Sequence, residues 1–178
     1  MTTRELEMAI FKKLRKIGTY ICFEVMMPSE NNRTGINNER VDLITYEKKG
    51  IWRFYELKIT KQDYYSKNKH TFRGHFNYYV LPDNLYDEVK HDIAEHIGVY
   101  LATDYGSRYI NGRIFCECVK KAKKQPLCVD NDKLKFAFMQ ALSREHDKYR
   151  HMRYKLEDDI INNSLIKKEG KCKKIHRE

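Results

Sequence analysis

The sequence predicts an α/β protein with a mixed β-sheet flanked by helices and followed by a C-terminal helix. Two observations predict this class. Apolar segments of strand length alternate with segments of helical periodicity, and the early strands follow one another with no helix between them, whereas helices separate the later ones. Strands joined by short turns pair antiparallel, and strands joined through helices pair in parallel, so both arrangements are expected in one sheet.

The first helix is expected over residues 2–17, because apolar residues recur there at helical spacing and Gly18 ends the pattern. On a helical wheel, Glu7 falls within the apolar stripe and Glu5 falls outside it. The wheel therefore predicts that Glu7, rather than Glu5, faces the core or a site at its rim. The alternative is a glutamate at the stripe edge that extends to water.

The remaining elements follow from alternation, turn residues and helical spacing. A Lys-Lys-Gly turn at 48–50 predicts a hairpin between the second and third strands, and Asn111-Gly112 predicts another near the end of the sheet. Strands are expected over 19–27, 41–46, 51–58, 75–81, 98–103 and 114–119, and further helices over 61–69, 84–95 and 132–168. We expect one domain over 1–145 and a basic helical extension over 146–178, disordered from about residue 167.

Composition narrows the class of protein. The chain has 178 residues, of which 41% are hydrophobic and 34% charged. We find no apolar run of about 18 residues and no apolar stretch of signal-peptide type at the N-terminus. Five cysteines at irregular spacing favour reduced thiols over a disulfide framework. A soluble, cytoplasmic protein without membrane association is the expectation.

Basic residues are concentrated toward the C-terminus. The net charge is +10; residues 1–119 hold 18 Lys+Arg and 16 Asp+Glu, and residues 120–178 hold 17 and 9, so the two parts carry +2 and +8. Such an excess favours binding of a polyanion, with nucleic acid preferred, although a solvated basic tail is the alternative. The expected phosphate contacts are Lys120, Lys121, Lys123 and Lys124, with Arg33 and Arg40 from the loop before the second strand.

Three residues of the predicted hairpin suggest chemistry. Asp42 lies in one strand, and Glu56 and Lys58 lie in the next, on one face. Two carboxylates at the end of a sheet suit Mg²⁺, with the main-chain carbonyl of Leu57 as a further ligand. Lys58 could orient or deprotonate water or offset charge on a phosphate, and Glu7 could hold a metal-bound water. A solvated surface ion pair remains the alternative.

The same residues resemble a known family. The helical Glu7, the strand Asp42 and Glu56-Leu57-Lys58 resemble the PD-(D/E)xK nuclease superfamily, which has the restriction-endonuclease-like fold, and are similar to archaeal Holliday-junction resolvases over the N-terminal third. The chain is still more similar to MmcB-type DNA-repair proteins, because Asp63-Tyr64, Lys69 and the segment 98–106 also match. Val41 replaces the superfamily's proline, Lys67 replaces an acidic residue, and His70 replaces an aromatic one.

This resemblance implies a Mg²⁺- or Mn²⁺-dependent deoxyribonuclease of DNA repair, recombination or mobile-element processing. The implied catalytic residues are Glu7, Asp42, Glu56 and Lys58, with Lys61 and Lys69 as further contacts to DNA. A homodimer is possible, since cleavage of a branched substrate at two sites needs two copies. The alternative is a catalytically inactive protein of the same fold that binds nucleic acid or a protein partner.

Overall fold

The computed structural model describes the backbone of residues 1–28, 39–66, 72–106 and 114–175. Its helices and strands are α1 (Thr3–Leu14), β1 (Thr19–Met26), β2 (Arg40–Glu47), β3 (Ile51–Leu57), α2 (Lys61–Tyr64), β4 (Phe76–Pro82), α3 (Asp83–Val89), β5 (Gly98–Asp104), β6 (Ile114–Lys120) and α4 (Asn131–Ile175). The predicted turn at Asn111-Gly112 lies outside the described residues. The predicted α/β class is confirmed.

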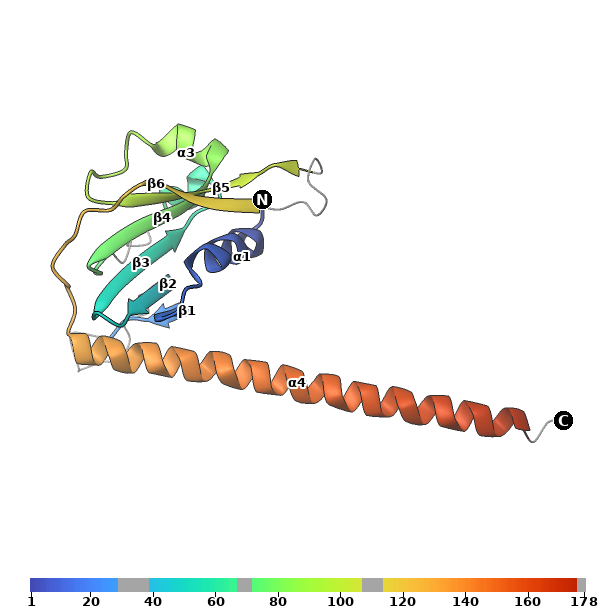
Figure 1. The fold of residues 1–178 in the computed structure, drawn as a ribbon. Coiled ribbons are helices and arrows are strands. Elements are labelled where there is room, and N and C mark those ends of the chain that lie inside the picture. Colours follow the sequence, from blue (N-terminus) through green and yellow to red (C-terminus); the bar gives the residue numbers. More distant parts are fainter. Residues whose placement is uncertain (29–38, 67–71, 107–113, 176–178) are drawn as a thin grey trace. The chain divides into compact units, whose positions relative to one another are not determined.

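The strands form one six-stranded sheet in the order β1-β2-β3-β4-β5-β6 (Figure 1). The first three strands pair antiparallel, β3 to β4 and β4 to β5 pair in parallel, and β6 returns antiparallel to β5. The β2–β3 turn is the predicted one, and Gly50 supplies its left-handed residue with φ of 75°. The carboxyl ends of β3, β4 and β5 therefore lie together at one end of the sheet.

Helix α1 covers one face of the sheet. Thr2 and Glu5 form a capping box at its start, which confirms that Glu5 does not face the core. The buried side of α1, including Leu6 and Ile10, packs on every second residue of the central strands. The strand residues of this core are Leu43, Tyr55, Leu57, Tyr78, Val80, Ala102 and Cys116.

The opposite face is covered by α2, α3 and the first turns of α4. Leu85 and Val89 of α3 pack on β4 and β5 with Tyr79 and Val99. Near β2 and β3, the fully buried Trp52 packs edge to face against Phe138 of α4, with ring centroids 5.5 Å apart. Its indole nitrogen donates a hydrogen bond to Asn131 Oδ1 at 2.9 Å.

Three predicted boundaries differ from the structure. The helix expected over 61–69 is the single turn α2 within the described residues, and the helix expected over 84–95 ends at Val89. After Val89 the chain forms turns that bury Ile93 and Ile97 against the sheet, a tertiary gain that outweighs local helix propensity. Lys58 lies just beyond the end of β3.

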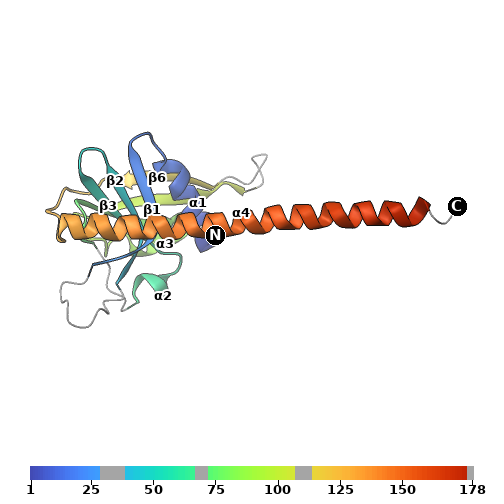
Figure 2. The ribbon, with the colours of Figure 1, turned by 90° about the horizontal axis from the view of Figure 1, so that it is seen from below.

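The chain divides into two compact units, Met1–Ala141 and Leu142–Glu178, close to the boundary expected at 145/146. The backbone of α4 is helical without a break through Ile175 (Figure 2), and disorder from residue 167 stays a prediction. Ion pairs spaced three and four residues apart support the described part of the second unit, including Lys148–Glu145 and Arg153–Glu157.

Candidate functional site

The β2–β3 hairpin opens at the position of Asp42. The last ladder pair is Leu43 with Tyr55, and beyond it the two backbones no longer pair. The Asp42 side chain replaces the missing backbone hydrogen bond, because its Oδ2 accepts a hydrogen bond from the Leu57 N–H at 2.8 Å. Asp42 therefore lies beside the segment Glu56-Leu57-Lys58, as predicted, through its hydrogen bond with Leu57.

Glu56 lies on the face of the sheet opposite α1. Its neighbours in β3, Tyr55 and Leu57, belong to the core under α1, so strand alternation turns Glu56 the other way. In the register it lies beside Tyr79 of β4, and it is only 5% exposed. This burial argues against the solvated surface ion pair that the sequence left as the alternative.

Lys58 is a buried cation between two carboxylates. Its Nζ lies 4.0 Å from Glu56 Oε2 and 3.4 Å from Asp63 Oδ1, and its side chain is 8% exposed. Its main-chain N–H donates to the Val80 carbonyl at 3.1 Å, which ties the residue to β4. A buried ammonium is costly unless it is paired, so these two carboxylates are what make the position tenable.

Burial raises the pKa of Asp42 above its usual value, and the charge of Asp63 raises it further. The hydrogen bond from Leu57 N–H and the charge of Lys58 act in the opposite direction. Burial also raises the pKa of Glu7 on α1, with contributions from the charges of Glu24 and Asp42. Glu7, which the helical wheel assigns to the core or a site at its rim, is half-buried and influenced by the charge of Asp42.

Glu24 is an acidic residue of this region that sequence reasoning missed. It is the only non-glycine residue of the described chain with positive φ, at 52°. In the β1–β2 register it falls between the pairs Phe23–Leu43 and Val25–Val41, at the level of Asp42. Its carboxylate also meets Arg40 at 3.4 Å. No pattern in the sequence indicates a left-handed residue inside a strand, so only the structure reveals it.

Asp63 is the closer partner of Lys58; the sequence included it in the family resemblance but did not predict this contact. Thr60 caps α2 by accepting a hydrogen bond from the Asp63 N–H at 3.2 Å. The buried Tyr64 anchors this turn on Tyr79, with ring centroids 5.1 Å apart. The Thr-x-x-Asp spacing after a strand is the signal that could have identified this capped turn.

The predicted DNA contacts fall into three groups. Lys120 donates to the carbonyls of Ile93 and Ala94 at 3.2 and 2.9 Å, and Lys123 pairs with Glu95, so both hold the segment after α3 in place. Lys121 and Lys124 are exposed, and Lys61 pairs with Glu88 at 3.5 Å on the surface. Arg33 and Lys69 lie outside the described residues.

Within the parts of the chain that the structure describes, no three His, Cys, Asp or Glu side chains converge as a metal-binding group. None of the described helices is both long and apolar enough to span a membrane.

Comparisons with known proteins show the fold alone. No protein-family model matches the chain, and no curated protein matches it. A solved structure, the SPO1766 protein of unknown function from Silicibacter pomeroyi, is similar over 86% of this chain and 92% of that chain, with a TM-score of 0.61 and 16% identity. The chain is thus an α/β protein whose mixed sheet architecture occurs in at least one other protein.

The raised pKa of Asp42 predicts a stability effect. The pKa of the Asp42 carboxyl is higher in the folded state than in the unfolded state, so the folded state binds the proton more tightly. As the pH rises above the unfolded pKa, the unfolded state is favoured because it releases the proton more easily, and folding stability falls. Asp42→Asn keeps an oxygen that can accept from Leu57 N–H and removes this cost. We expect the variant to be more stable than the wild type at neutral pH with chelator, with the difference shrinking toward pH 4 as measured by urea unfolding.

The exposed Asp87, which pairs with Lys90 at 3.1 Å, supplies the control. Asp87→Asn should change stability by no more than about 0.5 kcal/mol at either pH. A variant at Asp42 that is less stable than the wild type at neutral pH, by more than this control, would contradict the prediction.

Proposed function

We propose that this protein is a metal-dependent nuclease that hydrolyses phosphodiester bonds in DNA. One observation carries the proposal: Asp42 accepts a hydrogen bond from the Leu57 N–H, and on either side of Leu57 the buried Glu56 and Lys58 face each other, with Lys58 Nζ 4.0 Å from Glu56 Oε2. A fold gains little stability from two buried charges such as Glu56 and Lys58, since apolar residues of similar size serve as well or better. Their presence is better explained by chemistry than by structure.

The donor set fits Mg²⁺ or Mn²⁺. These cations prefer oxygen ligands and are commonly held by one or two carboxylates with water completing the shell. Asp42 and Glu56 would hold the ion, with the Leu57 carbonyl as a third oxygen; when bound, the ion would supply Lewis acidity at the phosphate. Asp42 uses one oxygen for Leu57 N–H, and a carboxylate has further lone pairs available.

Lys58 and Glu7 supply charge stabilisation and water positioning in this proposal. The Lys58 ammonium, held between Glu56 and Asp63, offsets negative charge that grows on the phosphate during attack by water. Glu7, whose raised pKa makes it a better proton acceptor than an ordinary glutamate, orients that water from the helix side. The net charge of +10 brings the polyanion to the protein.

A second candidate is a protein of this fold that binds nucleic acid without cutting it. The observation that favours it is the low exposure of the two central side chains, 7% for Glu56 and 8% for Lys58. A substrate phosphate reaches them only if the neighbouring turn at Asp63 gives way. Asp63 at this turn is itself half exposed.

The test is cleavage of labelled linear, single-stranded, flapped and four-way DNAs with Mg²⁺ or Mn²⁺. We expect the wild type to cut at least one of these and chelator to stop it. Asp42→Asn should abolish cutting while DNA binding in chelator survives, and the control Asp87→Asn should cut as the wild type does. Equal cutting by wild type and Asp42→Asn would reject the proposal. Binding with no cutting of any DNA would favour the second candidate.

A further inference from the structure

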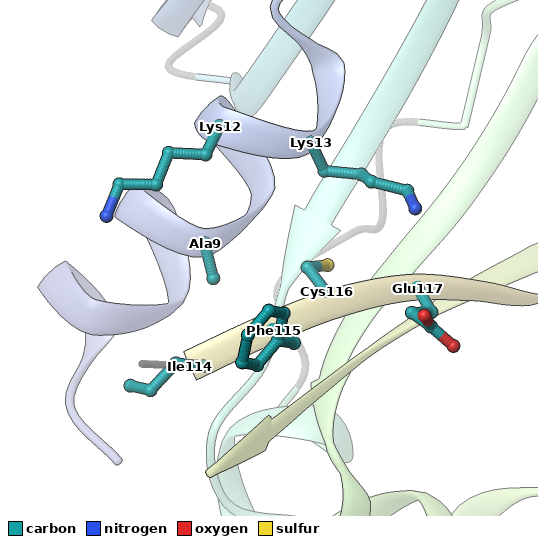
Figure 3. A pocket seen from close by; sticks show the side chains of 7 residues that line it. All are labelled: Ala9, Lys12, Lys13, Ile114, Phe115, Cys116 and Glu117. Carbon is teal, nitrogen blue, oxygen red and sulfur yellow. The ribbon is translucent and has the colours of Figure 1, made fainter. Parts of the chain in front are cut away.

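A groove lies between α1 and the edge strand β6 (Figure 3). Its volume is about 460 Å³, within the usual range of ligand pockets. Ala9, Lys12 and Lys13 line it from the helix, and residues 114–117 line it from the strand. Because β6 pairs with β5 and stands last in the strand order, its outer edge borders this space.

Phe115 of the strand side belongs to an exposed aromatic pair with Tyr105, which does not itself line the groove. Phe115 is 45% exposed and Tyr105 is 52% exposed, and their rings meet edge to face with centroids 5.6 Å apart. Two large rings left open to water at the margin of a sheet are costly to folding and suited to stacking. The contact with Tyr105 also restrains the Phe115 ring, which lowers the entropy lost when a flat ligand binds.

Positive charge lies on the helix side. Figure 3 shows the Lys12 and Lys13 side chains leaving α1 in opposite directions, with Lys13 extending over β6, and both residues are exposed. The charge of Lys13 acts on the thiols of Cys116 and Cys118, which shows that the ammonium stands close to this strand. Burial still raises the pKa of Cys116 to about 12, so that thiol is an inert part of the wall rather than a nucleophile.

Glu117 is the acidic group of the lining. Ile114 and Cys116 pack under α1, so strand alternation turns Phe115 and Glu117 toward the other side of the β6 edge. A ligand that passes around this edge meets one aromatic ring, two ammonium groups and one carboxylate, which match the parts of a nucleotide. The ring suits the base, the ammonium groups suit phosphate, and a carboxylate accepts hydrogen bonds from the amino group of a base. A duplex cannot present a base in this way, because its bases are stacked and paired.

The groove lies at the same end of the sheet as the candidate active site. Ile114 pairs with Asp104 at the carboxyl end of β5, and Glu56 lies at the carboxyl end of β3, which runs parallel to β5 through β4. Three strand spacings, roughly 14 Å, separate β3 from β6, and Phe115 lies level with Thr103, four residues or about 13 Å along the strands from the level of Glu56. A few nucleotides of single strand span that distance.

We infer that this groove binds an unpaired segment of the DNA on which the protein acts, with a base against Phe115 and backbone phosphates at Lys12 and Lys13. The inference rests on the proposed function for the identity of the polyanion, but it concerns binding alone. It defines the substrate class as DNA that carries an unpaired segment beside the bond to be cut, such as a flap or a single-stranded tail.

The test measures binding of short labelled DNAs to the full chain by fluorescence anisotropy, in chelator so that nothing is cut. The wild type is expected to bind a single strand more tightly than a blunt duplex. Phe115→Leu should weaken single-strand binding roughly 5- to 100-fold, the range for loss of one stacked base. With a strand that lacks bases the same substitution should have no effect, which separates stacking from a general loss of structure.

The salt dependence of single-strand binding tests the role of the two lysines. Lys12→Gln with Lys13→Gln should make the salt dependence of single-strand binding shallower by about 1.4, since each phosphate contact contributes about 0.7. The controls are Phe136→Leu and Lys90→Gln, an exposed phenylalanine on α4 and an exposed lysine after α3. Both should bind as the wild type does.

The inference is overturned if the protein binds no DNA, if Phe115→Leu binds single strands normally, or if its loss is the same on the strand without bases. The experiments distinguish failure of this inference from failure of the proposed nuclease function. Groove-dependent binding without any cleavage would overturn only the nuclease. Metal-dependent cleavage that Asp42→Asn abolishes, with groove variants unaffected, would overturn only the groove.

Discussion

Replacing Lys58 with methionine is expected to reduce DNA cleavage by about 10²- to 10³-fold, the usual cost of removing one preorganised donor from a transition state. Methionine is of similar length and removes the ammonium that lies between Glu56 and Asp63. The same change should also lower the free energy of unfolding by up to roughly 3 kcal/mol, because Glu56 is left as a buried charge. Single-turnover cleavage and urea unfolding measure the two effects.

A double variant separates these effects. Glu56→Gln together with Lys58→Met removes both buried charges, so we expect it to recover most of the lost stability and none of the activity. Lys61→Met, at an exposed lysine that pairs with Glu88, is the matched control for stability. Recovery of cleavage in the double variant would show that Lys58 acts only through folding, and its role in the chemistry would be withdrawn.

Replacing Trp52 with alanine is expected to cost about 3–5 kcal/mol of folding stability, the usual range for a buried large aromatic. Trp52 is fully buried, and its ring lies 4.2 Å from Tyr46 and 5.5 Å from Phe138, measured between centroids. It also donates to Asn131 Oδ1 at 2.9 Å, so one residue joins β2, β3 and the start of α4. Equilibrium unfolding in urea measures the loss.

Two further variants help to separate the contributions of ring packing and hydrogen bonding to this loss of stability. Trp52→Phe retains an aromatic ring and loses the hydrogen bond, so a smaller loss is expected than for alanine. Phe136→Ala, at a residue 60% exposed on the same helix, should change stability by no more than about 0.5 kcal/mol. A loss for Trp52→Ala as small as that control would mean that the packing of α4 on the sheet contributes little.

Local patterns in the sequence were sufficient for most of the fold. Alternation located the strands because one face of each is buried, and the Lys-Lys-Gly turn defined the hairpin because Gly50 adopts the positive φ that the turn requires. The helical wheel separated Glu7 from Glu5 because α1 is amphipathic, and the structure accordingly leaves Glu5 in the capping box. Each of these inferences depends on neighbours within a few residues.

The candidate site was predicted less completely. Asp42, Glu56 and Lys58 could be grouped from their spacing on a hairpin, and they do lie together. Asp63 could not be added, since its contact with Lys58 depends on how Tyr64 docks α2 onto Tyr79 of β4. Lys120 was expected to contact phosphate from its place in a basic run, but it binds the carbonyls after α3.

The sequence by itself determined the strands, most helices, the order of pairing in the first hairpin and the residue types available for phosphodiester chemistry. These properties depend on periodicity and turn residues, which are local. Only the tertiary structure decided that Lys58 is buried between Glu56 and Asp63, that Glu24 adopts a left-handed conformation beside Asp42, and that Lys12, Lys13 and Phe115 border one groove. The physical reason is that burial, ion pairing and cavities arise between segments distant in sequence, and their energies depend on the complete packing of the sheet.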